Sequence, residues 1–211
     1  MKVYEYGCPN AKTVLVQMVG EHDLHAIENE AIIIKEKTEI NFQLIALKVE
    51  DWNRDLSPWK APAVFGNADF GDGAMNTLRE VLQQCHDQDR TYYIGGYSLS
   101  GLFALWAAYQ TDIFKGVAAA SPSIWFPGFT EYMRDHFILS EKVYLSLGDK
   151  EPRTRNPVMS LVGEKIEEAC GILKARGIPC FFEWNRGNHF ADADVRTAKA
   201  FTWVLRFQTE L

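Results

Sequence analysis

Residues 92–101 read YYIGGYSLSG and join an apolar, strand-like run directly to a run with helical spacing. A serine at the apex of such a turn is the arrangement known as a nucleophile elbow. The turn leaves room only for small residues two positions before and two positions after the serine. Gly96 and Ser100 hold these positions around Ser98. Centring the turn on Ser100 would place Leu102 at the second position, so Ser98 is the better candidate nucleophile.

The usual elbow pattern is Gly-x-Ser-x-Gly, and in this chain Ser100 stands in place of the second glycine. Taken alone, the match also fits an ordinary strand-to-helix turn. Its place after a central apolar strand favours the functional interpretation. In that case the backbone N–H of Leu99, at the start of the helix, points toward a developing oxyanion. We expect the second donor in the loop after the first long strand, near Gly20 and Glu21.

Strand-like and helix-like segments alternate along the rest of the chain. Short apolar runs predict strands at residues 13–19, 40–48, 92–95, 116–120, 143–147 and 180–184. Helical spacing predicts helices at residues 26–37, 73–85, 99–109, 130–137, 157–176 and 194–207. The alternation predicts an α/β fold with a mostly parallel sheet of about six strands and helices on both faces. At most one extra strand, near residues 3–6, is expected at the N-terminus.

Length and composition predict a single domain. The chain has 211 residues, of which 47% are hydrophobic, so residues 1–211 are expected to form one domain around a substantial core. Lys and Arg total 22 against 28 Asp and Glu, and the net charge of −6 argues against nucleic-acid and anionic-membrane partners. No apolar run approaches the roughly 18 residues of a membrane span.

Two features point to the cytoplasm. The first residues lack the apolar segment of an export signal. The four cysteines show no Cys-x-x-Cys spacing, which is typical of free thiols in a reducing compartment.

A serine nucleophile needs a base and an acid, which follow the serine in the order acid and then histidine in α/β-hydrolases. His189 is the only one of the five histidines just past the last predicted strand. The acid is expected after the strand at residues 143–147, where Asp149 and Glu151 compete. Glu151 is favoured, because hydrolase acids commonly lie a few residues past the glycine that closes this strand. Asp149 stays open as the alternative, and the carboxylate that is not used is expected to cap the turn.

Four segments resemble the esterase D-like family of α/β-hydrolases, whose relatives include S-formylglutathione hydrolases and siderophore esterases. They are GYSLSG at 96–101, SPSIW at 121–125, GDKEP at 148–152 and GNHF at 187–190. The resemblance implies a minimal α/β-hydrolase with Ser98, Glu151 and His189 as its triad and no cofactor. Relatives usually carry a His-Gly pair after the first long strand, where this chain has Val19-Gly20.

Other possible sites are weaker. Residues 21–25, EHDLH, hold four possible metal ligands, but no distant His or Cys pair completes a set, so no metal is expected. The glycines at 66–73 lack the pattern of a nucleotide-binding loop. His22 is a candidate for the catalytic cleft. Trp59 and Trp125 are candidates for its walls, with a role in pinning loops as the alternative for each.

These observations predict a serine hydrolase that cleaves a small-molecule carboxylic ester through an acyl-enzyme on Ser98. One alternative is an acyltransferase that uses the same intermediate. Another is a non-catalytic binding domain that keeps the hydrolase fold. The sequence predicts neither the natural ester nor the oligomeric state.

Overall fold

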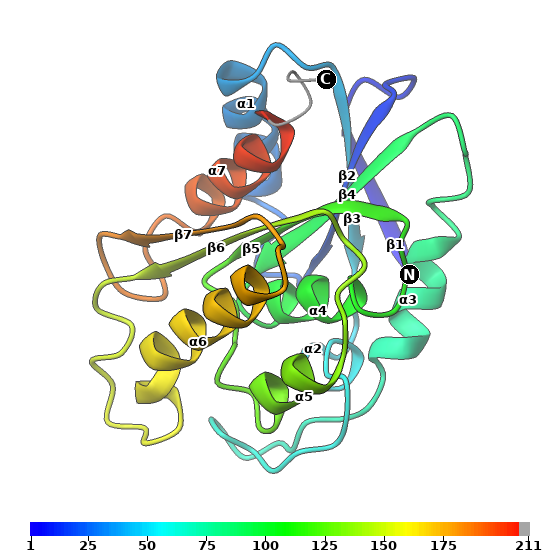
Figure 1. Cartoon of the computed structure of the whole chain (residues 1–211). Coiled ribbons are helices and arrows are strands. Elements are labelled where there is room, and N and C mark those ends of the chain that lie inside the picture. The colour runs from blue at the N-terminus through cyan, green and yellow to red at the C-terminus, as the bar shows by residue number, and fades with distance from the viewer. Residues whose placement is uncertain (207–211) are drawn as a thin grey trace.

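A computed structural model describes residues 1–206 and builds them around one seven-stranded sheet (Figure 1). The strands are β1 (Lys2–Gly7), β2 (Thr13–Val19), β3 (Phe42–Lys48), β4 (Thr91–Tyr97), β5 (Phe114–Ala120), β6 (Lys142–Gly148) and β7 (Cys180–Asn185). The helices are α1 (Ile27–Lys37), α2 (Trp52–Asp55), α3 (Ala74–Leu82), α4 (Leu99–Ala107), α5 (Phe129–Asp135), α6 (Val162–Ala175) and α7 (Ala193–Arg206). A 3-10 turn at Met159–Leu161 precedes α6.

The strand order in the sheet is β1-β3-β2-β4-β5-β6-β7. Strand β1 pairs with β3 in the antiparallel sense, and the other neighbours are parallel. The predicted α/β fold with a mostly parallel sheet is therefore confirmed, with β1 as the extra N-terminal strand. From β2 the chain moves outward to β3 and then returns to β4 on the other side of β2. Such a reversal leaves a crevice at the carboxyl ends of β2 and β4, where ligands bind in open α/β sheets.

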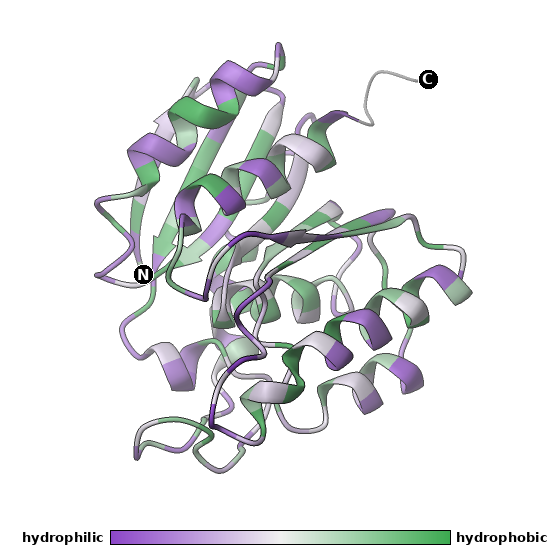
Figure 2. Ribbon diagram, turned by 90° about the vertical axis from the view of Figure 1, so that its left-hand side faces the viewer, coloured by the Kyte–Doolittle hydropathy of each residue, from purple (hydrophilic) through white to green (hydrophobic). Residues whose placement is uncertain are grey.

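Helices cover both faces of the sheet, as Figures 1 and 2 show. Alternate residues of β2 explain why. Val14 and Val16 belong to the core that packs against α3, α4, α5 and α6, whereas Leu15 belongs to the core under α1 and α7. All seven residues of β2 are buried, which accounts for its nearly continuous apolar sequence. Helix α4, which follows the elbow, is buried along its whole length.

The element boundaries differ from the predicted ones mainly at helix ends. The segment predicted as one helix from residue 157 begins as a turn, and α6 starts only at Val162. The last helix was expected to reach Phe207, which lies outside the described residues. The long irregular stretch at residues 50–72 contains the short helix α2 and a single bridge between Ala61 and Phe70. No helix among residues 1–206 is both long enough and apolar enough to cross a membrane.

Glu30 is a carboxylic acid buried inside this fold. It lies on α1, is 2% exposed and accepts a hydrogen bond of 3.2 Å from the side chain of Gln17 on β2. Its other oxygen has no hydrogen-bond partner within residues 1–206. Burial raises the pKa of Glu30 to about 8, and the carboxylates of Asp194 and Asp23 add to the rise against the opposing hydrogen bond from Gln17.

This raised pKa predicts a pH-dependent stability. Between pH 4.5 and about 8 the folded chain keeps a proton on Glu30 that the unfolded chain releases, so the free energy of unfolding should fall as the pH rises. The slope from this group is up to about 1.4 kcal/mol per pH unit. Glu30→Gln should remove it, so the variant should be the more stable chain near pH 8 and similar to the wild type below pH 4.5.

Urea unfolding of both chains across this pH range measures the difference. Glu28→Gln is the matched control, because Glu28 is exposed on the same helix, and it should leave the pH dependence unchanged. An unaltered slope in Glu30→Gln would show that Glu30 is not the group responsible.

Candidate active site

Three side chains that are far apart in the sequence meet at the carboxyl edge of the sheet. Ser98 follows β4, and its Oγ lies 3.0 Å from Nε2 of His189, which follows β7. The other ring nitrogen of His189, Nδ1, lies 2.7 Å from Oε2 of Glu151, which follows β6. The parallel strands bring these loops to one edge, and the chain of hydrogen bonds runs from hydroxyl to imidazole to carboxylate.

The elbow has the tight geometry that its small residues indicate. Ser98 has φ 57° and ψ −124°, a conformation that side-chain-bearing residues rarely adopt. A Cβ at Gly96 would lie 2.1 Å from Oγ of Ser100, so only glycine fits there. The Ser100 hydroxyl is buried and donates a hydrogen bond of 2.7 Å to the carbonyl of Met18 on β2. Serine in place of the usual glycine therefore fixes the start of α4 to the neighbouring strand.

Two backbone amides at the positions expected for oxyanion donors have no acceptor in the described part of the chain. The N–H groups of Leu99 and Glu21 donate no hydrogen bond to any acceptor in residues 1–206. The N–H of Gly20, by contrast, is used, because it donates to Asp23 Oδ2 over 2.8 Å. Of the two positions expected for the second donor, Glu21 is thus the one left open. Its side chain is exposed and forms an ion pair with Lys48.

The two competing carboxylates have different partners. Glu151 is 5% exposed at its side chain and turns one oxygen to His189. Its other oxygen, Oε1, accepts hydrogen bonds from the Gly148 N–H at 2.7 Å and the Ser121 hydroxyl at 2.8 Å. Asp149 is exposed, and its Oδ1 accepts from the N–H of Gly187 over 2.8 Å. Asp149 therefore caps the loop that carries His189, while Glu151 contacts the imidazole.

Tyr97, the residue between Gly96 and Ser98, holds the histidine from the other side. Its hydroxyl donates to the backbone carbonyl of His189 over 2.8 Å, and the two rings lie 5.2 Å apart. Burial raises the pKa of Tyr97, and the nearby Glu151 carboxylate adds to the effect. The phenol therefore stays protonated and remains a donor at neutral pH.

A cavity of about 640 Å³ opens beside Ser98 and His189. Aromatic side chains form much of its wall: Trp52, Phe65, Tyr97, Trp125 and Phe190. His22 also lines it, and its ring packs edge-on with the ring of Trp52, with the two ring centroids 5.3 Å apart. The structure thus brings two of the three predicted wall residues, His22 and Trp125, to the candidate nucleophile.

Trp59 is not among the residues that line this cavity, which corrects the prediction that it forms a wall of the site. Its indole N–H donates to the carbonyl of Pro127 over 2.9 Å. Its ring packs against Phe126, Phe129 and Tyr132. Those contacts fix the long loop onto α5 and the segment before it, which was the alternative role expected for a tryptophan in this loop.

The sequence interpretation missed three polar residues around Glu151 and His189, namely Tyr97, Ser121 and Arg196. Ser121 lies in one of the segments that carried the family resemblance, but no role was assigned to it. The position of Arg196 in the sequence could have indicated its role. Arg196, Ala200 and Val204 are four positions apart on the buried face of α7, so a charged residue occupies an otherwise apolar stripe. A charge at such a position indicates a buried partner.

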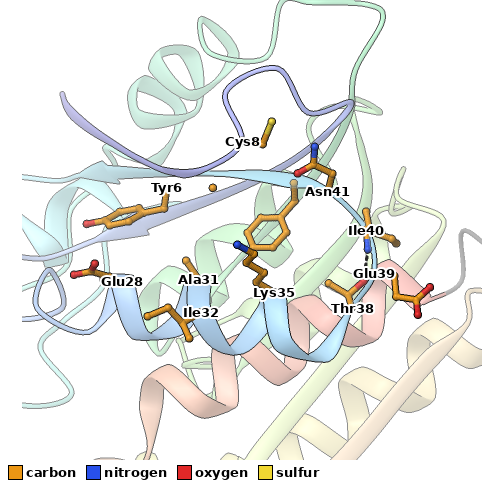
Figure 3. A pocket seen from close by; sticks show the side chains of 12 residues that line it. Tyr6, Cys8, Glu28, Ala31, Ile32, Lys35, Thr38, Glu39, Ile40 and Asn41 are labelled. Carbon is orange, nitrogen blue, oxygen red and sulfur yellow. Dashed lines mark hydrogen bonds between the residues drawn. The ribbon is translucent and has the colours of Figure 1, made fainter.

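Another hollow, of about 580 Å³, lies between β1 and α1 (Figure 3). Tyr6, Glu28 and Lys35 are among its lining residues, and Ser98, Glu151 and His189 are not. It is therefore separate from the candidate active site. In the described part of the chain, no group of three or more His, Cys, Asp or Glu side chains is arranged to hold a metal ion.

Searches with the sequence found no matching family model and no matching curated protein. The structure, however, matches solved structures over nearly its whole length. An IroE-like serine hydrolase from Shewanella oneidensis superposes with a TM-score of 0.75 over 95% of this chain and 74% of that protein, at 13% identity. Siderophore hydrolase EstA from Aspergillus nidulans gives 0.65 over 96% and 86%, at 19% identity.

FphF, a fluorophosphonate-binding serine hydrolase of Staphylococcus aureus, gives a TM-score of 0.63 over 97% of both chains at 13% identity. Similarity at these identities concerns the arrangement of the backbone. It agrees with the strand order and the parallel pairing described above. The chain therefore has the α/β-hydrolase fold of these serine hydrolases.

Proposed function

We propose that this protein is a serine hydrolase that cleaves small-molecule carboxylic esters. The observation that carries the proposal is the hydrogen-bonded series from Ser98 through His189 to Glu151, beside an open cavity. A serine hydroxyl becomes a competent nucleophile when an oriented base accepts its proton. The names of the proteins with this fold, serine hydrolases and a siderophore hydrolase among them, support the same class of reaction.

In the first half-reaction, Ser98 Oγ attacks the ester carbonyl carbon as its proton passes to His189 Nε2. The carbonyl oxygen becomes an oxyanion, for which the N–H groups of Leu99 and Glu21 are the candidate donors. The bond from carbon to the alcohol oxygen then breaks, and His189 gives its proton to the departing alcohol. Glu151 holds the imidazole in one tautomer and stabilises the imidazolium. An acyl ester on Ser98 is left.

In the second half-reaction, a water molecule loses a proton to His189 and attacks the acyl carbon. When the tetrahedral intermediate collapses, Ser98 leaves and takes back a proton from His189, and the carboxylic acid is released. The overall reaction consumes one water and one ester and yields an acid and an alcohol, so the cycle needs no metal or organic cofactor.

The cavity indicates which esters to try first. Its wall is rich in aromatic side chains, which favour an apolar or aromatic acyl or alcohol group. We therefore propose esters with such groups as substrates in preference to short, highly polar ones. We also propose, from length, net charge and cysteine spacing, that residues 1–211 form one domain that acts in the cytoplasm without nucleic-acid or membrane partners.

A fluorophosphonate probe followed by an ester panel tests the proposal. The probe should phosphonylate one residue, identified as Ser98 by peptide mass spectrometry, and Ser98→Ala should not be labelled. The panel of p-nitrophenyl esters should include acetyl, longer acyl and aromatic acyl groups. Absence of both labelling and hydrolysis in a folded chain would favour the non-catalytic binding domain instead.

Acyl transfer uses the same intermediate and differs only in the acceptor. Adding alcohols or thiols to the ester assay and analysing the products separates the two reactions. Hydrolysis predicts the free acid as the main product at every acceptor concentration. A new ester or thioester that replaces the acid would make this protein a transferase.

A further inference from the structure

Arg196 is a buried cation next to the candidate active site. It lies in the first turn of α7 and is 3% exposed. Its Nη1 lies 3.2 Å from Oε1 of Glu151, whose side chain is 5% exposed. Burying an unpaired charge costs several kcal/mol, on the order of the whole stability of a small domain. A buried guanidinium that contacts the carboxylate of a hydrolase triad is therefore expected to have a role in the site.

The guanidinium joins segments that come from different parts of the sheet edge. Besides Glu151, its Nη1 lies 3.1 Å from the Tyr97 hydroxyl in the elbow and 3.4 Å from the Ser121 hydroxyl after β5. Its Nη2 donates over 3.0 Å to the carbonyl of Arg186, at the start of the loop that carries His189. One side chain therefore contacts the acid, the elbow and the histidine loop.

We propose that Arg196 is a positioning residue for the triad, an inference that rests on the proposed hydrolase function. It holds Oε1 of Glu151 in place, so that Oε2 faces His189 Nδ1. Through Arg186 and Tyr97 it also holds the loop that carries the imidazole within reach of Ser98. Arg196 is not among the residues that line the cavity, so it acts through Glu151 and His189 and does not touch substrate.

The geometry calls for arginine in particular. A guanidinium presents several donors in one plane and stays charged when buried, whereas a lysine ammonium is a compact, strongly hydrated point charge. Two nitrogens of Arg196 donate to acceptors in separate loops: Nη1 to Oε1 of Glu151 and Nη2 to the carbonyl of Arg186. Lysine at this position keeps the positive charge but loses the simultaneous contacts.

The test compares Arg196→Gln, which removes the charge, with Arg196→Lys, which keeps it. Arg196→Gln should lower kcat by roughly 10- to 100-fold, as is typical for partners that orient a functional histidine, and change KM little. Arg196→Lys should recover part of this loss. Arg153→Gln is the matched control, because Arg153 is exposed in the same loop as Glu151, and its activity should equal that of the wild type.

The split between kcat and KM separates positioning from general damage to the fold. An altered fold would change the cavity and with it KM, whereas a misplaced Glu151 or His189 lowers kcat alone. The residues that line the cavity are the same in both variants.

A double-mutant cycle with Glu151→Gln completes the experiment. Because Arg196 acts in part through Glu151, adding Arg196→Gln to Glu151→Gln should cost clearly less activity than the roughly 10- to 100-fold loss that Arg196→Gln causes in the wild type. The double variant also removes both buried charges, so it remains measurable if Arg196→Gln alone fails to fold.

Full additivity of the two losses, or a change in KM as large as the fall in kcat, would overturn the positioning role. The proposed hydrolase function itself would be overturned if the folded wild type neither hydrolysed esters nor reacted with the fluorophosphonate probe.

Discussion

Replacing Ser98 by alanine should lower kcat/KM for ester hydrolysis by about 10⁴- to 10⁶-fold. In the proposed mechanism the substitution removes the atom that carries the acyl group, while the candidate oxyanion donors and the cavity stay in place. Losses of this size follow when one member of a cooperating triad is removed, because the remaining members do not act without it. Initial rates of the variant and of the wild type, purified in parallel and measured against a buffer blank with the best ester of the panel, give the size of the effect.

Glycine at the same position separates catalysis from folding. Ser98 has φ 57° and ψ −124°, a conformation in which a Cβ is strained. Ser98→Gly should therefore be as inactive as Ser98→Ala but more stable than the wild type, by about 1 kcal/mol. Thermal unfolding of the three chains measures this. An alanine variant that is folded and still hydrolyses esters within tenfold of the wild type would remove Ser98 from the mechanism.

The sheet and its helices were predictable because their signals are local and repeated. A strand buried on both faces needs an apolar residue at nearly every position, and β2 and β5 follow that rule almost throughout. Helix ends were less predictable. Pro157 suits a first helical turn, yet the side chain of Asn156 accepts hydrogen bonds from the N–H groups of Val158 and Met159 and holds a turn before α6 begins.

The positions of the site residues were predictable for a topological reason. In a parallel sheet the loops after successive strands emerge at one edge, so a serine after β4 and a histidine after β7 face the same crevice. The partners of those residues were not predictable in this way. The contacts of Arg196 with Glu151 and Tyr97 depend on how α7 packs under the sheet, which no short stretch of sequence specifies.

The two tryptophans illustrate the same limit. Trp59 and Trp125 both lie in loops at the carboxyl edge, and the sequence makes both of them equally good candidates for the cavity wall. Packing separates them, because Trp59 is held by Pro127 and the rings around α5, whereas Trp125 contacts Phe65 and lines the cavity. Which aromatic ring faces a ligand depends on contacts between loops, which sequence spacing does not reveal.

The choice between Glu151 and Asp149 was also open in the sequence, and it leads to a matched pair of variants. Glu151→Gln should lower kcat by about 10²- to 10⁴-fold, because an amide no longer stabilises the imidazolium and can hold the wrong tautomer of His189. It also leaves the buried Arg196 without its counter-charge. Asp149→Asn should reduce kcat less than about threefold, because the asparagine carbonyl can still accept from the Gly187 N–H.

Steady-state kinetics of the two variants, with circular dichroism to show that each is folded, decides which carboxylate acts. The contrast does not depend on the choice of ester, since both changes lie outside the cavity wall. Equal losses in the two variants would mean that the histidine loop as a whole, held by both carboxylates, limits the rate. A larger loss in Asp149→Asn would move the role of triad acid to Asp149 and leave Glu151 as a partner of Arg196 alone.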